Sequence, residues 1–288
     1  MKSHSIPAEN LDLELTMTCG QTFCWNRTEG ELYGEGENEF YTFRKGKPMV
    51  IKETENGIEA ITELERDEVK DALDLHTDLD ETFSQFPENE ALERSKKELW
   101  GLRIINDEFF PCLISYLCSP QMRIERIKQM HDDIARKFGE KIEFNGEELH
   151  RFPNPEELSE ASEEELRDLG VGYRAEYIVE STEIIRNGFD HNELDEMSYG
   201  EAREKMKELY GVGDKVADCV LLFSKRFHEA YPIDTWAQKA VKAHLPDLHH
   251  DDYGKTSENV REHFGEKAGY AQEYLFHAAR KDIIEVEG

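Results

Sequence analysis

The chain has 288 residues, which is enough for two domains with a substantial hydrophobic core. Its hydrophobic fraction of 38% and aromatic fraction of 10% exclude a disordered protein, and its longest uncharged segment, FFPCLISYLCSPQM, is too short to span a membrane. The 64 acidic residues against 35 basic ones give a formal net charge of -29, which opposes a phosphate-rich partner unless contacts other than charge hold it.

Short strands are predicted up to about residue 62. The segments are aromatic-rich or alternate between apolar and polar residues, and turn residues separate them. They are LDLEL, QTFCWN, ELYGE, EFYTFR, PMVIKE and GIEAIT. We expect them to form an antiparallel meander.

From about residue 65 onward, apolar residues recur every three or four positions, which predicts helices. Helix starts are marked by two capping boxes, Ser162 with Glu165 and Ser198 with Glu201. The predicted fold class is α+β: an antiparallel β domain with a helix over residues 1–92, then a helical domain over residues 93–288.

A helix, a glycine turn and a second helix are predicted over residues 199–226, in YGEAREKMKELYGVGDKVADCVLLF. Gly211 and Gly213 permit unusual backbone angles and leave their amides uncovered, and Asp214 is the expected N-cap of the second helix. Amides at such a turn, beside the positive end of a helix, suit a phosphate group. An ordinary helix-helix connection is the alternative, but LxGVGxK between two amphipathic helices favours a hairpin that binds the DNA backbone.

Lys215 stands in the first turn of the second helix, where the helix dipole disfavours a cation and so favours a free amine. A free amine can form a Schiff base, although a lysine in contact with phosphate or solvent would also fit the pattern. Asp234, at the start of the next helix in PIDTW, is expected to be an N-cap that also steadies positive charge in a cleft. Cys219 lies one helical turn after Lys215, on the same face.

The five cysteines are interpreted as reduced, buried thiols. Cys19, Cys24, Cys112 and Cys118 are the candidates for a zinc site, but no CxxC or His pair supports such a site, and we expect no metal there.

Acidic residues are dispersed along the chain, as in PEELSEASEEELRDL, which we interpret as adaptation to a high-salt cytoplasm and hence a halophilic source. Two windows, residues 119–141 and 203–226, each hold six basic and four acidic residues and run against this trend. The opening MKSHSIPAEN lacks the apolar segment of a secretory signal, so we expect a cytoplasmic protein.

Six motifs in order resemble the helix-hairpin-helix, Gly/Pro-Asp superfamily of DNA glycosylases, and most closely its 8-oxoguanine DNA glycosylase/AP lyase of the eukaryotic and archaeal type. They are LDLELTMTCGQTFCW, LISYLCS, LGVGYRAEYI, LYGVGDKVADC, PIDTW and AGYAQEYLFHAAR. The resemblance implies a β domain similar to half of the TATA-binding protein, packed on helical subdomains. It also implies that double-stranded DNA containing 8-oxoguanine is the partner and that the protein is a monomer.

In catalysis, the resemblance implies that Lys215 attacks C1′ of the damaged nucleoside and forms a Schiff base. Asp234 would stabilise the cationic sugar, and β-elimination would then break the strand. The resemblance implies no required cofactor. Whether a monovalent cation binds the carbonyls of the hairpin stays an open question.

The lesion pocket follows from the same resemblance. Gly20 would offer its carbonyl to the N7 hydrogen that distinguishes 8-oxoguanine from guanine. Gln272 would bond the other edge of the base, while Cys219 and Phe276 would form the two sides of a stacking slot. Core packing of a terminal amphipathic helix is the alternative for Gln272 and Phe276.

Tyr173 is implied to fill the space that the flipped base leaves. Arg174 and Arg126 would contact the orphaned cytosine, because a guanidinium bonds two acceptors in one plane. Two positions depart from the family pattern: Gln121 stands where the family has an asparagine, and Trp236 replaces a histidine.

Three rivals are weighed against this interpretation. The endonuclease III branch carries four clustered cysteines near its C-terminus, and here no cysteine follows Cys219. The alkyladenine branch, which excises 3-methyladenine, normally lacks a lysine at the position of Lys215 and is the runner-up. A non-catalytic DNA-binding protein would need the hairpin but not Lys215, Asp234 or the pocket residues.

Overall fold

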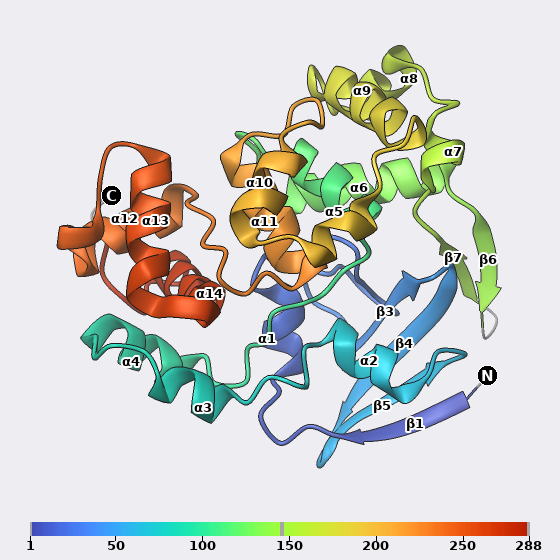
Figure 1. Ribbon diagram of the computed structural model, residues 1–288. Helices are drawn as coiled ribbons and strands as arrows, with labels where there is room; N and C mark the ends of the chain where they lie inside the picture. The colour runs from blue at the N-terminus through green and yellow to red at the C-terminus, as the bar shows by residue number, and fades with distance from the viewer. Residues whose placement is uncertain (1, 145–146, 287–288) are drawn as a thin grey trace.

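A five-stranded antiparallel sheet forms the N-terminal part of the computed structural model, which describes residues 2–144 and 147–286 (Figure 1). The strands are β1 (Lys2–Pro7), β2 (Asn26–Arg27), β3 (Glu39–Arg44), β4 (Lys47–Thr54) and β5 (Gly57–Thr62). They lie in the order β1-β5-β4-β3-β2. Strand alternation brings Phe40, Ile51 and Ala60 opposite one another on one face, and all three are buried. The predicted meander is therefore confirmed for EFYTFR, PMVIKE and GIEAIT.

The prediction of a strand at LDLEL was wrong, because this segment begins a helix, α1 (Leu13–Thr18). The Asp12 side chain accepts a hydrogen bond from the Leu15 amide (2.8 Å) and so caps the first turn. Of QTFCWN only Asn26 is in a strand, and ELYGE forms a turn. The outermost strand, β1, was not predicted.

The two faces of the sheet pack against different partners. One face packs on α1, on α2 (Arg66–Ala72) and on Trp25. On the other face, Val50 packs with Phe144 and Leu149 from a second hairpin, β6 (Lys141–Phe144) and β7 (Glu147–His150). This second hairpin interrupts the helical part and was also not predicted.

Helices form the rest of the chain, as expected. They are α3 (Leu79–Ser84), α4 (Glu90–Glu98), α5 (Phe109–Cys118), α6 (Ile124–Phe138), α7 (Pro155–Leu158), α8 (Glu163–Asp168), α9 (Arg174–Arg186), η1 (His191–Glu196), α10 (Tyr199–Met206), α11 (Asp214–Lys225), α12 (Thr235–His244), η2 (Pro246–Leu248), α13 (Tyr253–Phe264), η3 (Gly265–Lys267) and α14 (Ala268–Arg280). Both predicted capping boxes are present, at Ser162 and at Ser198.

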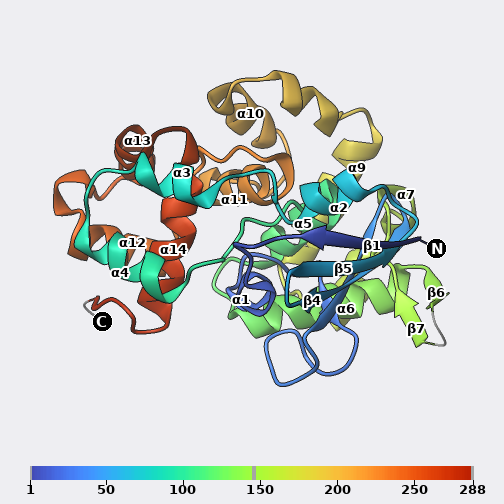
Figure 2. The same cartoon turned by 90° about the horizontal axis from the view of Figure 1, so that it is seen from below.

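Two buried helices, α5 and α11, form the centre of the helical core and pack against each other. On every side of α5 most of its own residues are apolar and buried, which is typical of a helix inside a protein. The helices α3 and α4 follow the sheet in sequence but lie beside α14, as both views show (Figures 1 and 2). The division between residues 92 and 93 stays a prediction.

In the part of the chain that the structure describes, no helix combines the length and the apolar character that a membrane crossing requires.

Candidate active site

The helix-hairpin-helix consists of α10, a turn that holds two glycines, and α11. Gly211 has φ +83°, and a Cβ there would lie 2.5 Å from Cγ of the Tyr177 ring, so only glycine fits. Around Gly213 a Cβ would meet nothing within 4 Å, and this residue N-caps α11 without a side-chain cap. The space beside Gly213 is therefore open, and the uncapped first amides of α11 suit an anion such as a phosphate group.

Asp214 was predicted to be the N-cap of α11, which was wrong, because it is the first residue of the helix. Its carboxylate pairs with Lys207 (3.1 Å) and Arg203 (3.4 Å) of the preceding segment. The Asp214 side chain is thus engaged with these two cations, and no side-chain cap is present at the start of α11.

A buried carboxylate, Asp218, links the two hairpin helices through hydrogen bonds. It accepts hydrogen bonds from the hydroxyls of Tyr199 and Tyr253 (both 2.6 Å) and from Nε of Arg203 (2.7 Å). Because three donors satisfy it, the charge is tolerated in the core and ties α10, α11 and α13 together.

Lys215 extends from the first turn of α11 towards the end of α5. Its Nζ donates to Oγ of Ser119 (3.0 Å) and lies 5.1 Å from the centre of the Tyr116 ring. Both neighbours are uncharged, so neither holds the amine in an ion pair.

Asp234 caps α12, as predicted, by accepting a hydrogen bond from the Ala237 amide (2.7 Å). Burial raises the pKa of the Asp234 carboxyl, while the Ala237 amide and the charge of Lys215 act in the opposite direction. The carboxyl and the amine are therefore electrostatically coupled across the cleft.

One cavity of about 1040 Å³ gathers ten of the twelve residues that the sequence singles out. They are Gly20, Gln121, Tyr173, Gly211, Gly213, Lys215, Cys219, Asp234, Gln272 and Phe276. These residues come from segments far apart in the sequence, between the end of α1 and α14. The fold thus brings the lysine, the aspartate and the predicted slot to one place.

The inner part of the cavity includes Cys219, Gln272 and Phe276, all of them buried. Burial raises the pKa of Cys219 to about 12, so its thiol keeps its proton at neutral pH. Within the described part of the chain, no partner bonds Oε1 of Gln272, which leaves a buried acceptor in the cavity wall.

Gly20 lies where the helix α1 has just ended, with φ +109°. A Cβ there would be strained by this φ and would lie 2.6 Å from both Arg280 Nη1 and Ile124 Cδ1, so these two side chains would have to move. The preceding carbonyl, of Cys19, accepts hydrogen bonds from Nη1 of Arg280 (2.5 Å) and Nδ1 of His277 (3.1 Å). The last long helix therefore holds the Gly20 segment in place.

Large apolar side chains are exposed near the mouth of the cavity. Tyr173 is 50% exposed and Met122 is 36% exposed, and both line the cavity. Tyr210, 44% exposed, stands beside Gly211 in the hairpin turn. Gln121 has φ +58°, a conformation that is costly for a residue with a Cβ. Such exposed rings and strained backbone are typical of a binding surface.

The two predicted arginines do not line the cavity. The buried Arg174 guanidinium lies 4.6 Å from the Tyr173 ring, and its NH groups donate to the carbonyls of Pro120 and Val171. Arg126 donates to Gln129 Oε1 (2.6 Å) and to the Leu169 carbonyl (3.1 Å).

The lining residues that the sequence reasoning missed include Ser119, Met122, Glu273 and Arg280. A signal existed for Glu273, because it precedes Phe276 by three positions and so lies on the same helix face.

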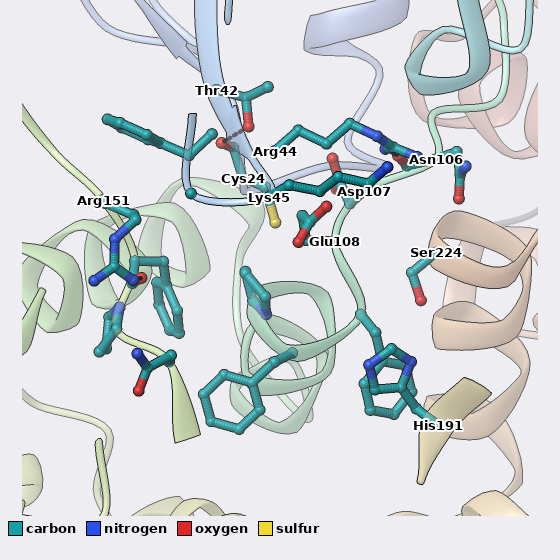
Figure 3. Close-up of a pocket in the computed structure, with 18 of the residues that line it drawn as sticks. Cys24, Thr42, Arg44, Lys45, Asn106, Asp107, Glu108, Arg151, His191 and Ser224 are labelled. Atoms are coloured by element: carbon teal, nitrogen blue, oxygen red, sulfur yellow. Dashed lines mark hydrogen bonds between the residues drawn. The ribbon is translucent and has the colours of Figure 1, made fainter. Parts of the chain in front are cut away.

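A second pocket of about 650 Å³ lies at the opposite end of α11, near Ser224 (Figure 3). Lysines and arginines in its wall, among them Arg44 and Arg151, are matched in number by carboxylates such as Asp107 and Glu108. The wall therefore has no net charge to attract phosphate, and none of the predicted site residues belongs to it.

All five cysteines are free thiols. Among residues 2–144 and 147–286, no group of three or more His, Cys, Asp or Glu side chains could hold a metal ion.

The glycine hairpin, the adjacent lysine, the capping aspartate and the buried slot together define a DNA glycosylase of the helix-hairpin-helix class. Family comparisons agree: residues 3–113 match the N-terminal domain of 8-oxoguanine DNA glycosylase, and residues 114–267 match the HhH-GPD superfamily of base excision DNA repair proteins.

Full-length relatives are more specific. A probable N-glycosylase/DNA lyase of Methanothermobacter thermautotrophicus is 33% identical, with 96% of each chain covered. N-glycosylase/DNA lyase OGG1 of Arabidopsis thaliana is also 33% identical, over 96% of this chain and 80% of the relative. The 8-oxoguanine glycosylase/lyase of Clostridium acetobutylicum, solved with double-stranded DNA containing cytosine opposite 8-oxoguanine, superposes with a TM-score of 0.83 at 30% identity, covering 96% of this chain and 94% of that one. The chain belongs to the 8-oxoguanine DNA glycosylase/lyase family.

Proposed function

We propose that this protein is a bifunctional DNA glycosylase and AP lyase that excises 8-oxoguanine from duplex DNA during base excision repair. The observation that carries the proposal is the position of Lys215, whose amine lies at a cavity that also contains Asp234, Gly20 and Gln272. The relatives named N-glycosylase/DNA lyase and 8-oxoguanine glycosylase/lyase support it.

DNA binding begins at the hairpin, where the free amides of α11 hold a backbone phosphate. Contacts of this kind position the enzyme without reading sequence. The damaged base leaves the stack to reach the cavity, and the exposed ring of Tyr173 fills the vacated space. Gln121, Arg126 and Arg174 contact the orphaned cytosine, for which Arg174 exchanges its present bonds to Pro120 and Val171.

Recognition uses the hydrogen that 8-oxoguanine carries on N7, which guanine lacks. The Gly20 carbonyl accepts this hydrogen without introducing a charge. Oε1 of Gln272, which has no partner within the described chain, accepts from donors on the other edge of the base. Cys219 and Phe276 stack on the two faces of the ring. A base without the N7 hydrogen leaves an acceptor unpaired, and this penalty gives selectivity.

The chemistry is covalent catalysis by an amine. The lone pair of Lys215 Nζ forms a bond to C1′ while the C1′–N9 bond breaks, with its electron pair going to the base. The Asp234 carboxylate stabilises positive charge on the sugar. The C1′–O4′ bond then opens, its electron pair goes to O4′, a proton of the bound amine passes to O4′, and a Schiff base results. Water takes up a C2′ proton, the C2′–C3′ double bond forms, and the 3′ phosphate leaves in β-elimination.

These steps use side chains of the protein alone and need no cofactor. A monovalent cation at the hairpin carbonyls would assist only the grip on DNA. We expect the enzyme to act as a monomer in the cytoplasm, where DNA is its partner.

The test is borohydride trapping on duplexes that carry one 8-oxoguanine, with Lys215→Gln as the variant. Glutamine keeps the length and polarity of the side chain but cannot form a Schiff base, so we expect loss of the covalent adduct and of chain scission. Lys239→Gln, on α12 outside the cavity lining, is the control and should keep both.

Full adduct formation by Lys215→Gln would contradict the proposal. Release of 3-methyladenine with no action on 8-oxoguanine would support the alkylpurine glycosylase instead, and binding without any release would support a DNA-binding protein that is not an enzyme.

A further inference from the structure

The cavity wall contains a carboxyl group that the chemistry above does not use. Glu273 follows Gln272 on α14, is 1% exposed and lines the cavity. In the described part of the chain its Oε1 has no hydrogen-bond partner. An ionisable side chain is rarely buried in this way unless something binds it.

The surroundings of Glu273 leave its charge without a strong counterpart. The titratable groups that face it are Cys19 after α1, Tyr116 on α5, Cys219 on α11, Asp234 at the start of α12 and Arg280 on its own helix. Arg280 is the cation of this set, and its Nη1 already donates to the Cys19 carbonyl. The Cys19 thiol lies within hydrogen-bonding reach of Glu273 and also of the Thr16 carbonyl (3.4 Å).

Burial raises the pKa of Glu273 to about 7, and the nearby Asp234 carboxylate adds to this effect. The Cys19 thiol and Arg280 act in the opposite direction. Near neutral pH a large share of the molecules therefore carry a neutral carboxylic acid in the cavity wall, which can donate a hydrogen bond as well as accept one.

Two consecutive residues, Gln272 and Glu273, thus line the same cavity, and each has a buried side-chain oxygen without a partner among the described residues. A purine offers both donors and acceptors along its edge. The Gln272 oxygen suits a donor on the base, and a protonated Glu273 suits an acceptor. A hydrogen bond to an acceptor gains strength as negative charge develops on the departing base.

We propose that Glu273 is a catalytic acid of the glycosylase step: its carboxyl group donates a hydrogen bond to the flipped base and passes its proton to that base as the C1′–N9 bond breaks. The inference rests on the proposed function.

The step balances in atoms and charge. The Lys215 amine forms a bond to C1′, and the C1′–N9 electron pair goes to the base. The Glu273 proton then neutralises the base. A neutral amine, a neutral nucleoside and a neutral acid become an ammonium on C1′, a neutral free base and a Glu273 carboxylate.

This role separates the two activities of the enzyme. An abasic site has no base to expel, so its cleavage does not need the Glu273 proton. A residue that only supported the fold would affect both activities together.

The experiment compares wild type, Glu273→Gln and Glu262→Gln, the last an exposed glutamate on α13 outside the cavity lining. Single-turnover release of 8-oxoguanine and cleavage of a preformed abasic site are measured between pH 5.5 and 9. Glutamine fills the same space and still donates a hydrogen bond, but it has no proton to give.

For Glu273→Gln we expect base release at pH 6 to fall by about 10²-fold. The wild-type rate should decline above pH 7 as the acid ionises, and the variant should lack this decline. Cleavage of abasic DNA should stay within about twofold of wild type, which also shows that the variant is folded. Glu262→Gln should match wild type in both assays.

Three outcomes would overturn the inference: base release by Glu273→Gln at the wild-type rate, a parallel loss of both activities, or a wild-type rate without a decline above pH 7. A failure of the proposed function looks different, because the wild type itself would then release no 8-oxoguanine.

Discussion

At the scale of single residues, burial determines the character of the carboxyl groups in the cavity. Asp234 caps α12 by accepting a hydrogen bond from the Ala237 amide. Glu273 lies on α14, and one of its carboxyl oxygens has no partner among the described residues. Burial raises the pKa of both groups, and that of Glu273 reaches about 7. The two carboxyl groups thus lie in different environments, which suits them to different proposed roles: Asp234 stabilises positive charge on the sugar, and Glu273 donates a proton to the base.

The raised pKa of Glu273 predicts that its ionisation destabilises the fold. The unfolded chain loses this proton near pH 4.5, whereas the folded chain keeps it until about pH 7. The folded state therefore binds more protons in this interval, and the contribution of Glu273 to stability falls as the pH rises through it. Glu273→Gln should gain about 3 kcal/mol relative to wild type between pH 4 and pH 8, measured by urea unfolding.

Shifted groups that do not interact with Glu273 affect both proteins equally and cancel in this difference. They include Asp107, whose pKa burial raises to about 6, and His277, whose pKa burial lowers to about 4. Equal changes in stability for variant and wild type between the two pH values would show that folding does not raise the pKa of Glu273.

Single residues were predictable where a motif fixes them. Lys215 and Asp234 were candidates because glycine turns and helix starts constrain residue type within a few positions, whereas Gly20 came from the family resemblance alone. The structure places all three at one cavity, and their roles stay predictions. The orientation of Arg174 was not predictable, because its guanidinium bonds carbonyls that only the folded chain brings near. The pairing of Asp214 with Lys207 and Arg203 likewise overrode its tendency to cap a helix.

At the scale of elements, the hairpin turn contains two glycines with different requirements. Gly211 needs a left-handed conformation and contacts the Tyr177 ring, whereas Gly213 has an ordinary φ of -98° and open space around it. Gly211 is therefore needed for the fold, whereas Gly213 keeps the amides at the start of α11 accessible.

Alanine at each position should separate these two functions. Gly211→Ala should destabilise the protein by about 1–3 kcal/mol, because of the positive φ and the contact with Tyr177. Gly213→Ala should keep or slightly raise stability, yet weaken binding to undamaged duplex about tenfold, because its methyl group lies over the phosphate site. Urea unfolding and fluorescence anisotropy at fixed salt give the two values.

Gly265→Ala is a suitable control, since this glycine also has a positive φ but lies outside the hairpin and the cavity. It should lose stability without a loss of DNA affinity. Unchanged affinity in Gly213→Ala would place the phosphate elsewhere.

Elements were predictable where periodicity is long and uniform, as in α11 and α14. Short segments were not. LDLEL alternates like a strand, but the hydrogen bond from the Leu15 amide to Asp12 starts a helix there. In the β6–β7 hairpin, Phe144 and Leu149 pack on Val50 of the sheet. This contact joins distant parts of the chain, so no local sequence pattern predicts it.

At the scale of the whole molecule, the net charge of -29 predicts that salt stabilises the protein. Dispersed carboxylates repel one another, and raising KCl from 0.01 to 1 M shortens the screening length from about 30 Å to about 3 Å. We expect the free energy of unfolding at pH 8 to rise over this range.

The same KCl series near pH 4.7, the isoelectric point of the sequence, is the internal control, because the net charge of the protein there is close to zero. The salt effect should shrink at this pH. An equal effect at both pH values would point to a general action of the salt instead of screening.

The bonds from His277 and Arg280 to the Cys19 carbonyl join positions 258 and 261 residues apart. The ribosome makes Cys19 early and α14 almost last, so this carbonyl meets its two donors only when nearly the whole chain has been synthesised. A chain that ends before α14 also lacks Gln272 and Phe276, and with them one wall of the cavity. The compartment for the base is therefore complete only at the end of synthesis.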